Sequence, residues 1–479
     1  MNDELDQAVK AQDGMQDLLD AQRAAFGRDM NPGHAVRSDR LGRLLAMTER
    51  NEAEIAAAIA SDFGHRSRHE TVMAETFTVI AGVRHARRHL RNWMKAKRVP
   101  TPVYLLPGYS RVLLQPLGVV GIISPWNYPY QLALAPAIGA LAAGNRVMLK
   151  PSEFTPRLAA LLKEIVAKYF ADDEMTVILG DADVGRAFAA LAFDHLLFTG
   201  STAVGREVAV AAARNLTPVT LELGGKSPAI LDPECDLARA APQLAMGKLL
   251  NAGQTCIAPD YALVPESRLE AFVQALSGAA AALYPSVLRN PDYSSIASER
   301  QFRRLHGLID DARSKGARVI TVNPADERFD DQARKLPLTL LLQTHDGMRA
   351  MQEEIFGPIL PVVTYGQIDE AIAHVNRGPR PLALYWFGDD TARRDRILRQ
   401  TLSGGVTVND TLWHFCQENL PFGGVGASGS GAYHGEQGFL AFSKQKGVYF
   451  QRRLNAARLL YPPYGRRFEA VIRLLKRIA

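Results

Sequence analysis

The sequence has few cysteines and lacks a long apolar segment. Three cysteines in 479 residues (Cys235, Cys256 and Cys416) are too few for a disulfide framework and indicate a reducing compartment. The polar, acidic N-terminus lacks the apolar core of a secretory signal. The longest apolar stretch, residues 132–143, includes Pro136 and is too short to span a bilayer. We therefore expect a soluble cytoplasmic protein, long enough for two or three domains.

The body of the chain also lacks a net positive charge. The formal net charge is +6, but residues 452–479 contain eight Arg or Lys and one Glu, so the rest is close to neutral. A nucleic-acid partner is not expected, because it would need a basic face on the body. In the tail, Phe468, Val471, Ile472 and Leu475 recur at helical spacing. Such a basic amphipathic helix either packs on the body or a partner subunit, which we prefer, or lies on an anionic membrane surface.

The pattern of apolar residues changes along the chain and predicts an α/β protein. Residues 1–97 have helical periodicity, and two extended runs flank Pro107-Gly108 like a hairpin. From residue 118, short apolar runs alternate with helical stretches, which predicts a doubly wound parallel sheet followed by a second α/β region. The five expected strands of the first sheet are 118–124, 146–149, 175–179, 195–199 and 218–222.

One thiol and one carboxylate indicate acyl chemistry. Cys256 lies in the run GQTCI, and Glu222, in LELGGK, precedes it by 34 positions. A thiol can hold an acyl group and a carboxylate can activate the water that releases it. Asn127, in the turn SPWNYP, is a candidate hydrogen-bond donor to an oxyanion. A buried structural cysteine and an ordinary turn are the alternatives.

Two expected strand ends could bind a nucleotide. Gly200 and Ser201 lie where a strand meets a helix, so free N–H groups there suit a pyrophosphate. Lys150 and Glu153 follow another strand and could bind the two hydroxyls of a ribose. The G-x-G-x-x-G match at 424–429 opens no βαβ unit, so we interpret it as a tight loop.

Together these segments resemble the aldehyde dehydrogenase superfamily from about residue 30 to 450. The motifs are SPWNYP, KPSE, FTGSTAVG, LELGGKSP, GQTCIAP, EEIFGPILP and LPFGGVGASGSG. The runs WNYP, GQTCIAPDY, PFGGVG and YHG are similar to the class 3 branch. Residues 115–153 are similar to bacterial coniferyl aldehyde dehydrogenases.

The resemblance implies a role for each matching residue. It makes Cys256 the nucleophile, Glu222 the general base and Asn127 an oxyanion donor beside the Cys256 N–H. We further expect Cys256 to lie in a site that favours the thiolate. The residues expected to bind NAD, or alternatively NADP, are Lys150, Glu153, Gly200, Ser201, Gly205, Glu354 and Phe356. No metal site is expected.

The resemblance also implies how the chain is divided into domains and how it assembles. We expect a homodimer, with the hairpin packing on a C-terminal strand of a neighbouring subunit. The expected parts are an NAD(P)-binding domain (1–97 and 117–222), a catalytic domain (223–420), an oligomerisation arm with a C-terminal loop (98–116 and 421–450) and a basic tail (451–479).

Aromatic residues near Asn127 and in the C-terminal loop indicate a bulky aldehyde as the substrate. Trp126, Tyr128 and His414 are the candidate substrate contacts, with ordinary core packing as the alternative. The expected reaction is NAD(P)-dependent oxidation of an aromatic aldehyde such as coniferaldehyde to ferulate. The alternatives are a long-chain fatty aldehyde dehydrogenase and a coenzyme-A-acylating enzyme, which Glu222 disfavours because that branch generally lacks the base.

Overall fold

The N-terminal part of the chain is helical, as its apolar spacing predicts. The computed structural model describes residues 2–329, 331–455 and 457–478. Leu41, Leu44 and Ile55 are fully buried in the main core. The helices are α1 (Asn2–Arg28), α2 (His34–Arg50), α3 (Glu52–Phe63), α4 (Arg68–Thr71) and α5 (Phe77–Trp93), with a π-helical turn, η1 (Val72–Thr76), between α4 and α5.

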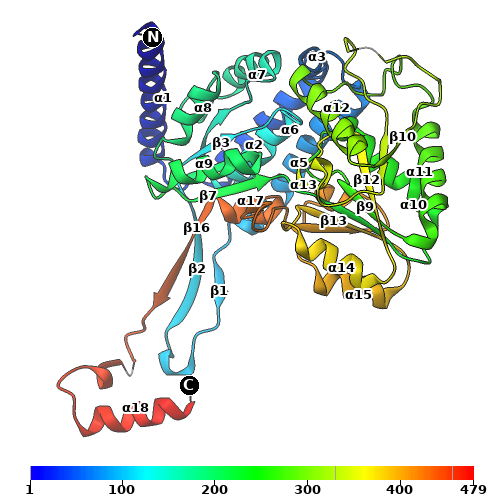
Figure 1. Ribbon diagram of the computed structural model, residues 1–479. Coiled ribbons are helices and arrows are strands. Elements are labelled where there is room, and N and C mark those ends of the chain that lie inside the picture. Colours follow the sequence, from blue (N-terminus) through cyan, green and yellow to red (C-terminus); the bar gives the residue numbers. More distant parts are fainter. Residues whose placement is uncertain (1, 330, 456, 479) are drawn as a thin grey trace.

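The first sheet is doubly wound and contains the five expected parallel strands in the order β7-β6-β3-β4-β5. Helices α6 and α7 pack on one face, and α1, α8 and α9 on the other (Figure 1). The strands are β3 (Val119–Ile123), β4 (Arg146–Lys150), β5 (Met175–Val177), β6 (His195–Gly200) and β7 (Val219–Leu223). The helices are α6 (Gln131–Ala143), α7 (Pro156–Tyr169), α8 (Ala182–Ala189) and α9 (Thr202–Ala213).

A sixth strand at the edge of this sheet was not expected. β15 (Gly429–Ser430) pairs antiparallel with β7, so that Gly429 lies opposite Glu222. It follows the turn in which Gly426 has a φ of 64° and bridges to Gly429. The interpretation of residues 424–429 as a tight loop is therefore confirmed, and this loop lies beside the candidate base.

The second sheet has seven strands in the order β10-β11-β12-β9-β8-β13-β14, all parallel except β10. Its strands are β8 (Pro228–Leu231), β9 (Tyr261–Pro265), β10 (Arg318–Thr321), β11 (Thr339–Leu342), β12 (Ile359–Tyr365), β13 (Ala383–Phe387) and β14 (Gly405–Val408). The accompanying helices are α10 (Leu237–Leu249), α11 (Leu269–Leu283), α12 (Glu299–Ser314), α13 (Arg349–Gln352), α14 (Ile368–Arg377), α15 (Thr391–Gln400) and α16 (Trp413–Cys416), whereas α17 (Gly435–Ala441) packs on α5 and α6. The short 3₁₀ turns η3 (Leu250–Gly253) and η4 (Glu266–Arg268) follow α10 and β9.

A three-stranded arm projects from the body (Figure 1). The expected hairpin is present: β1 (Lys97–Val99) pairs antiparallel with β2 (Tyr109–Pro116), and η2 (Val103–Leu105) lies between them. The other edge of β2 pairs with β16 (Ser443–Phe450) of the same chain. β2 therefore pairs with the C-terminal strand of its own chain, and packing of the hairpin on a neighbouring subunit stays a prediction.

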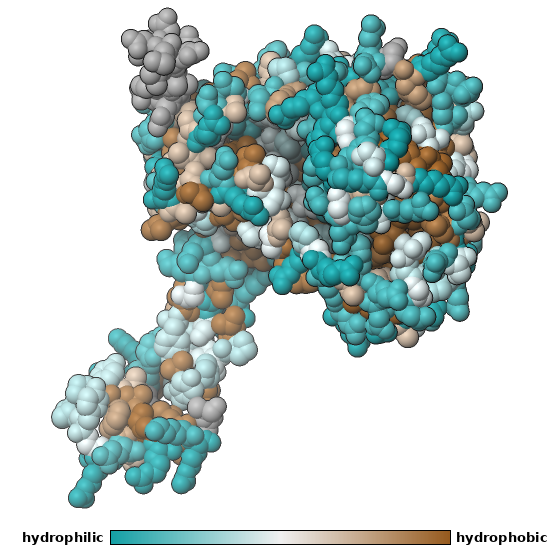
Figure 2. Space-filling model, in the orientation of Figure 1, coloured by the Kyte–Doolittle hydropathy of each residue, from teal (hydrophilic) through white to brown (hydrophobic). Residues whose placement is uncertain are grey.

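The tail forms the expected helix, but away from the body. η5 (Ala457–Leu460) and α18 (Arg466–Ile478) lie at the end of the arm (Figure 1). Apolar residues gather there beside a hydrophilic edge (Figure 2). The expectation that α18 packs on the body of its own chain was therefore wrong, which leaves a partner subunit or a membrane surface. In the described part of the chain, no helix combines the length and the apolar character needed to cross a membrane.

Candidate active site

The candidate nucleophile follows a strained turn between α10 and β9. Asn251, Ala252 and Gly253 have φ values of 53°, 51° and 74°. Left-handed backbone is uncommon outside glycine and persists where the surrounding structure holds it. A Cβ on Gly253 would lie 2.4 Å from the Gly357 carbonyl oxygen, so this position requires glycine. The turn ends by presenting Cys256 in the wall of an apolar pocket.

The thiol is held in its neutral form in this structure. Burial, together with the nearby carboxylates of Glu354 and Glu222, raises the pKa of Cys256 to about 12. Hydrogen bonds from the N–H groups of Cys256 and Ile257 lower the pKa by less. The expectation of a thiolate-favouring site was therefore wrong for this state, because lost hydration and two carboxylates outweigh two N–H donors.

Glu222 is buried without a hydrogen-bond partner. It lies near the end of β7, and neither of its carboxylate oxygens is hydrogen-bonded by any described residue. Burial therefore raises the pKa of Glu222 well above its usual value. A carboxyl with a raised pKa near a thiol is, once ionised, a stronger base than an ordinary carboxylate and is suited to act as a general base.

Asn127 lies between the first sheet and the loop that carries Cys256. It follows β3, is almost fully buried, and its Nδ2 donates to the Gln254 carbonyl oxygen at 3.1 Å. An amide group has two N–H donors, so one remains for another acceptor. The structure therefore brings together the three candidate catalytic residues, Cys256, Glu222 and Asn127.

The candidate cofactor residues lie at the carboxyl ends of strands in the first sheet. Lys150 ends β4, and its Nζ donates to the Pro151 carbonyl oxygen at 2.9 Å, while Glu153 is exposed nearby. Ser201 caps α9 by accepting a hydrogen bond from the Val204 N–H. Free N–H groups at this helix start suit an anion.

Gly205 has a packing role within α9. A Cβ at this position would lie 2.6 Å from Leu223 Cδ2, so glycine lets α9 approach β7 closely. The preceding Gly200 ends β6, where a Cβ would lie 2.5 Å from the Phe198 ring. The glycine at position 205 is therefore explained by the close packing of α9 on the sheet.

Glu354 and Phe356 come from the second sheet's side of the site. The Gly225 N–H donates to the Glu354 carboxylate, and burial raises the pKa of Glu354 to about 8. A Cβ on Gly224 would lie 1.9 Å from Glu354 Oε2, so only glycine allows this approach. The Phe356 and Trp126 rings pack edge to face with centroids 5.4 Å apart. These residues link the ends of the two sheets.

The pocket in front of Cys256 is apolar. Tyr128 is one of its walls, and its hydroxyl group is 2.6 Å from that of Thr255. The remaining lining residues are Met73, Ala74, Thr78, Gln131, Leu132, Met246, Leu250, Ile257, Thr411, Leu412, Trp413, Phe415 and Cys416. Most of these residues give no local sequence signal, because they come from five separate segments.

Two expected substrate contacts are not among the described residues that line this pocket. His414 Nδ1 is 2.8 Å from Thr407 Oγ1, and its ring stacks on Phe422. Burial lowers the pKa of His414 to about 4. Its neighbours Trp413 and Phe415 face the pocket instead, since successive residues of a helix point in different directions. Trp126 packs between Phe63 and Phe356.

A second apolar chamber adjoins this pocket. It shares Met73, Thr78, Gln131, Trp413, Phe415 and Cys416 with the first one and continues to Trp93, Glu418 and His434. Cys416, which has no motif in the sequence, thus lines both chambers. Two mainly apolar cavities therefore share a wall, and Cys256 lines one of them.

Comparison with known proteins identifies the family of this chain. The model of the aldehyde dehydrogenase family matches residues 7–448. The chain belongs to the aldehyde dehydrogenase family. It is 49% identical to a probable coniferyl aldehyde dehydrogenase of Pseudomonas aeruginosa over 98% of this chain and 97% of that protein. It is 48% identical to the coniferyl aldehyde dehydrogenase of a Pseudomonas species over 92% of each.

Solved structures of aldehyde dehydrogenases share the fold. The structure titled as the substrate-bound state of Staphylococcus aureus AldH superposes with a TM-score of 0.91, at 37% identity, covering 96% of this chain and 99% of that one. A Mycobacterium tuberculosis aldehyde dehydrogenase complexed with NAD+ superposes with a TM-score of 0.80, at 30% identity, covering 90% of this chain and 88% of that one. The expected family and α/β fold are thus confirmed, and the chain is an aldehyde dehydrogenase.

Proposed function

We propose that this aldehyde dehydrogenase oxidises an arylpropenal such as coniferaldehyde to its acid, ferulate. The single observation that carries this proposal is the apolar pocket that Cys256 lines, with Tyr128, Trp413 and Phe415 in its walls. Aromatic walls suit a planar, conjugated substrate, which loses little conformational freedom on binding. The two relatives named as coniferyl aldehyde dehydrogenases support the same substrate class.

The catalytic residues would act in two stages. Cys256 Sγ adds to the aldehyde carbon, and the second N–H of the Asn127 amide donates to the oxygen that becomes negative. Loss of hydride leaves an acyl thioester on Cys256. Glu222 then takes a proton from water, whose oxygen attacks the thioester carbon and releases the acid and the thiol. Because the thiol is neutral here, it must lose its proton before or during attack.

A nicotinamide dinucleotide, NAD or alternatively NADP, is the cofactor that fits the strand ends. It accepts the hydride when bound. The structure supports this fit through the capped start of α9 at Ser201, the buried Lys150 ammonium and the Glu354 carboxyl held at Gly224–Gly225. Glu153, exposed beside Lys150, would accept a 2′-hydroxyl and repel a 2′-phosphate, which favours NAD.

The substrate proposal is tested by steady-state kinetics. Coniferaldehyde, benzaldehyde and a long-chain alkanal are compared by NADH formation, with product analysis for the free acid. We expect the highest kcat/KM for coniferaldehyde. A higher value for the alkanal would overturn the aryl proposal in favour of a fatty aldehyde, which the second apolar chamber would accommodate.

The fate of the thioester separates hydrolysis from transfer to coenzyme A. The buried, unpartnered Glu222 favours hydrolysis, since it can activate water next to Cys256. Free acid formed without coenzyme A supports this assignment. A reaction that requires coenzyme A would contradict it.

We also propose a cytoplasmic homodimer formed through the arm. Its support is the apolar surface at the tip, where Val103, Tyr104 and Leu106 are exposed. The three cysteines are free, which agrees with a reducing compartment. Static light scattering would test the assembly, and a monomer at micromolar concentration would contradict it.

For the basic tail, we propose that α18 packs against the second copy. Its apolar side is only half-buried by η5 and Tyr464, which leaves surface to cover. Deletion after Pro463 should then weaken the dimer and leave liposome sedimentation unchanged. Loss of liposome sedimentation would instead support a membrane surface as the partner.

A further inference from the structure

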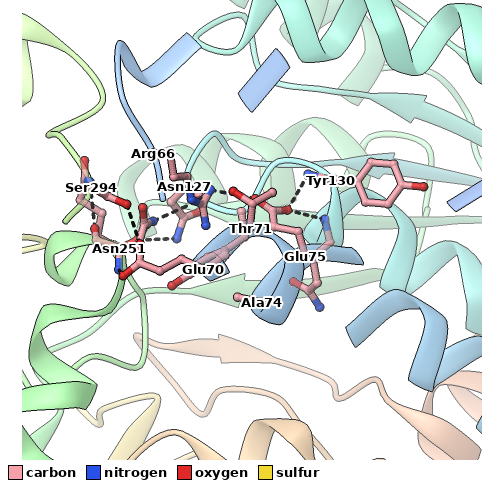
Figure 3. A network of polar contacts seen from close by, with 12 residues as sticks. Arg66, Glu70, Thr71, Ala74, Glu75, Asn127, Tyr130, Asn251 and Ser294 are labelled. Atoms are coloured by element: carbon pink, nitrogen blue, oxygen red, sulfur yellow. Dashed lines mark hydrogen bonds and ion pairs between the residues drawn. The ribbon is translucent and has the colours of Figure 1, made fainter. Parts of the chain in front are cut away.

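A buried polar network lies directly behind the candidate oxyanion donor (Figure 3). Arg66 and Glu75 form an ion pair at 2.8 Å, and both side chains are fully buried. Arg66 also donates to the backbone carbonyl oxygen of Asn127 at 2.9 Å. One guanidinium therefore links the N-terminal helices to the residue whose amide faces the nucleophile loop.

Glu75 holds the other end of the same turn. Its Oε2 accepts hydrogen bonds from the N–H groups of Tyr130 at 3.0 Å and Gln131 at 2.8 Å. The segment 127–131 is thus held by its first carbonyl and its last two amides. Each of these backbone groups faces one member of the Arg66–Glu75 pair, so the path of the turn is set by the pair.

Asn251 is a second donor to the Asn127 carbonyl oxygen. Its Nδ2 lies 3.0 Å from the Asn127 oxygen and 3.2 Å from the Gln254 oxygen. Glu70 accepts from the Asn251 N–H at 3.1 Å and from Ser294 Oγ at 2.5 Å. These hydrogen bonds connect the segment 127–131, which carries the candidate oxyanion donor, to the strained turn before Cys256. They also connect both to the helical segment that carries Glu70 and Glu75 (Figure 3).

The π-helical turn explains how Glu70 and Glu75, which lie only five residues apart, can both accept hydrogen bonds from the site. Glu70 binds the turn at Asn251, and Glu75 binds the segment 127–131. In a regular α-helix, residues five apart point about 140° away from each other. Between α4 and α5, the Phe77 N–H bonds to the Val72 carbonyl five residues earlier, which widens the helix. Glu70 and Glu75 are consequently both buried against the site. Such π-turns occur frequently at functional sites.

We propose that Arg66 and Asn251 are positioning residues that hold the Asn127 amide in place for the oxyanion. This inference rests on the proposed role of Asn127. Burying an ion pair contributes little net stability compared with apolar packing, so its geometry is the better explanation for its presence. The Asn127 amide already gives one N–H to Gln254, and holding its carbonyl with two donors directs the other toward the substrate oxygen.

A double-mutant cycle tests this proposal. The variants are Arg66→Lys, Asn127→Ala and the double variant, assayed for aldehyde kcat and KM and for cofactor-free hydrolysis of p-nitrophenyl acetate. Ester hydrolysis creates an oxyanion at Cys256 but needs no hydride acceptor. We expect Asn127→Ala to lower both rates about 100-fold and Arg66→Lys about 10-fold, with KM little changed. In the Asn127→Ala background, Arg66→Lys should have no further effect.

A second pair of variants separates positioning from folding. Asn251→Gly removes the other donor while glycine tolerates the φ of 53°, so we expect a loss of about 5-fold that also vanishes in the Asn127→Ala background. Ser295→Ala is the matched control, because the Ser295 hydroxyl donates to the Ala333 carbonyl oxygen at 2.8 Å and, in the described part of the chain, is not hydrogen-bonded to Asn127, Arg66 or Asn251. It should retain wild-type rates.

The outcomes distinguish the two proposals. If Asn127→Ala keeps wild-type rates, the oxyanion role is wrong and the positioning role falls with it. If Asn127→Ala is slow, but the Arg66 and Asn251 substitutions lower the rate by the same factor in the Asn127→Ala background as in the wild type, only the positioning proposal is overturned. Melting temperatures of each variant show whether the assayed protein is folded, and Asn251→Gly keeps the test available if Arg66→Lys is not.

Discussion

The candidate active site between the two sheets, with Glu222, Cys256 and Asn127, is called the seam below. The seam and the end of the arm depart from ordinary packing in opposite ways. At the seam, Glu222 is buried with no hydrogen-bond partner among the described residues. At the arm, apolar residues are exposed, with Tyr464 at 66% and Leu454 at 86% of full exposure. Buried polar groups and exposed apolar patches are the informative exceptions to residue burial. Each marks a place where the folded chain alone is incomplete.

The difference shows what each region requires. Removing water from a carboxyl raises its pKa and costs stability, which is tolerated where the group has a chemical task. Exposing apolar surface also costs free energy, which association with a second surface recovers. We therefore expect substitutions at the seam to change the rate of the reaction, and substitutions at the arm to change the oligomeric state.

The largest effect should come from Cys256→Ala. Removing the nucleophile should reduce aldehyde turnover about 10⁴-fold or more, because the thiol that would hold the acyl intermediate is gone. NADH formation measures the loss. Cys416→Ala is the matched control, since this cysteine lines the same pocket, and it should retain turnover within a few-fold. Undiminished turnover in Cys256→Ala would contradict the assignment of the nucleophile.

The next effect should come from Glu222→Gln, which keeps the shape of the side chain but removes the base. We expect steady-state turnover to fall about 10²- to 10⁴-fold, with acyl-enzyme accumulating and detectable by mass spectrometry. In the wild type, the hydrolytic rate should rise with pH through the raised pKa of Glu222, and the variant should lose this dependence. An unchanged pH profile would show that another group is the base.

The same substitution should stabilise the protein at neutral pH. Burial raises the pKa of Glu222 in the folded state, so between its usual value and the raised value the folded state binds more protons than the unfolded state. Stability contributed by this group is therefore present at low pH and is lost as pH rises through the raised pKa. Glu222→Gln should raise the melting temperature at pH 8 more than at pH 4. Equal shifts at both pH values would argue against a buried carboxylate.

Changes at the arm should affect assembly and leave chemistry intact. Leu106→Asp places a charge in the exposed apolar tip, and we expect a shift from dimer to monomer in light scattering. Because the arm is distant from the seam (Figure 1), kcat per subunit should change less than in either seam variant. Substitution of exposed Arg98, on the same arm, by Asp serves as a charge control.

The smallest effect on catalysis should come from deleting the tail after Pro463. α18 contacts η5 and Tyr464 but not the catalytic pocket, so kcat/KM should stay within about twofold of the full chain. Aldehyde titration of both proteins measures this. A large increase in KM would show that the tail reaches a substrate pocket, and would break the contrast between seam and arm.

Local patterns predicted most of the regular structure and pointed to the three candidate catalytic residues that the structure brings together. The five strands of the first sheet lie where their short apolar runs indicate. Glu222, Asn127 and Cys256 were found because each lies at the end of a strand or in a turn with an unusual run of residues. The two-residue strand β15 was missed because such a short segment has no periodicity.

The sequence by itself determined the family, the α/β class and the residues able to perform acyl chemistry, since these depend on residue types in short, ordered motifs. Tertiary structure alone decided that Cys256 is held neutral, because burial and the charges of Glu222 and Glu354 act through space. It also decided that Trp413 and Phe415, rather than His414, line the pocket beside Cys256, and that Arg66 donates a hydrogen bond to the Asn127 carbonyl oxygen. Directions of side chains and losses of hydration depend on segments far apart in the chain, which no local pattern records.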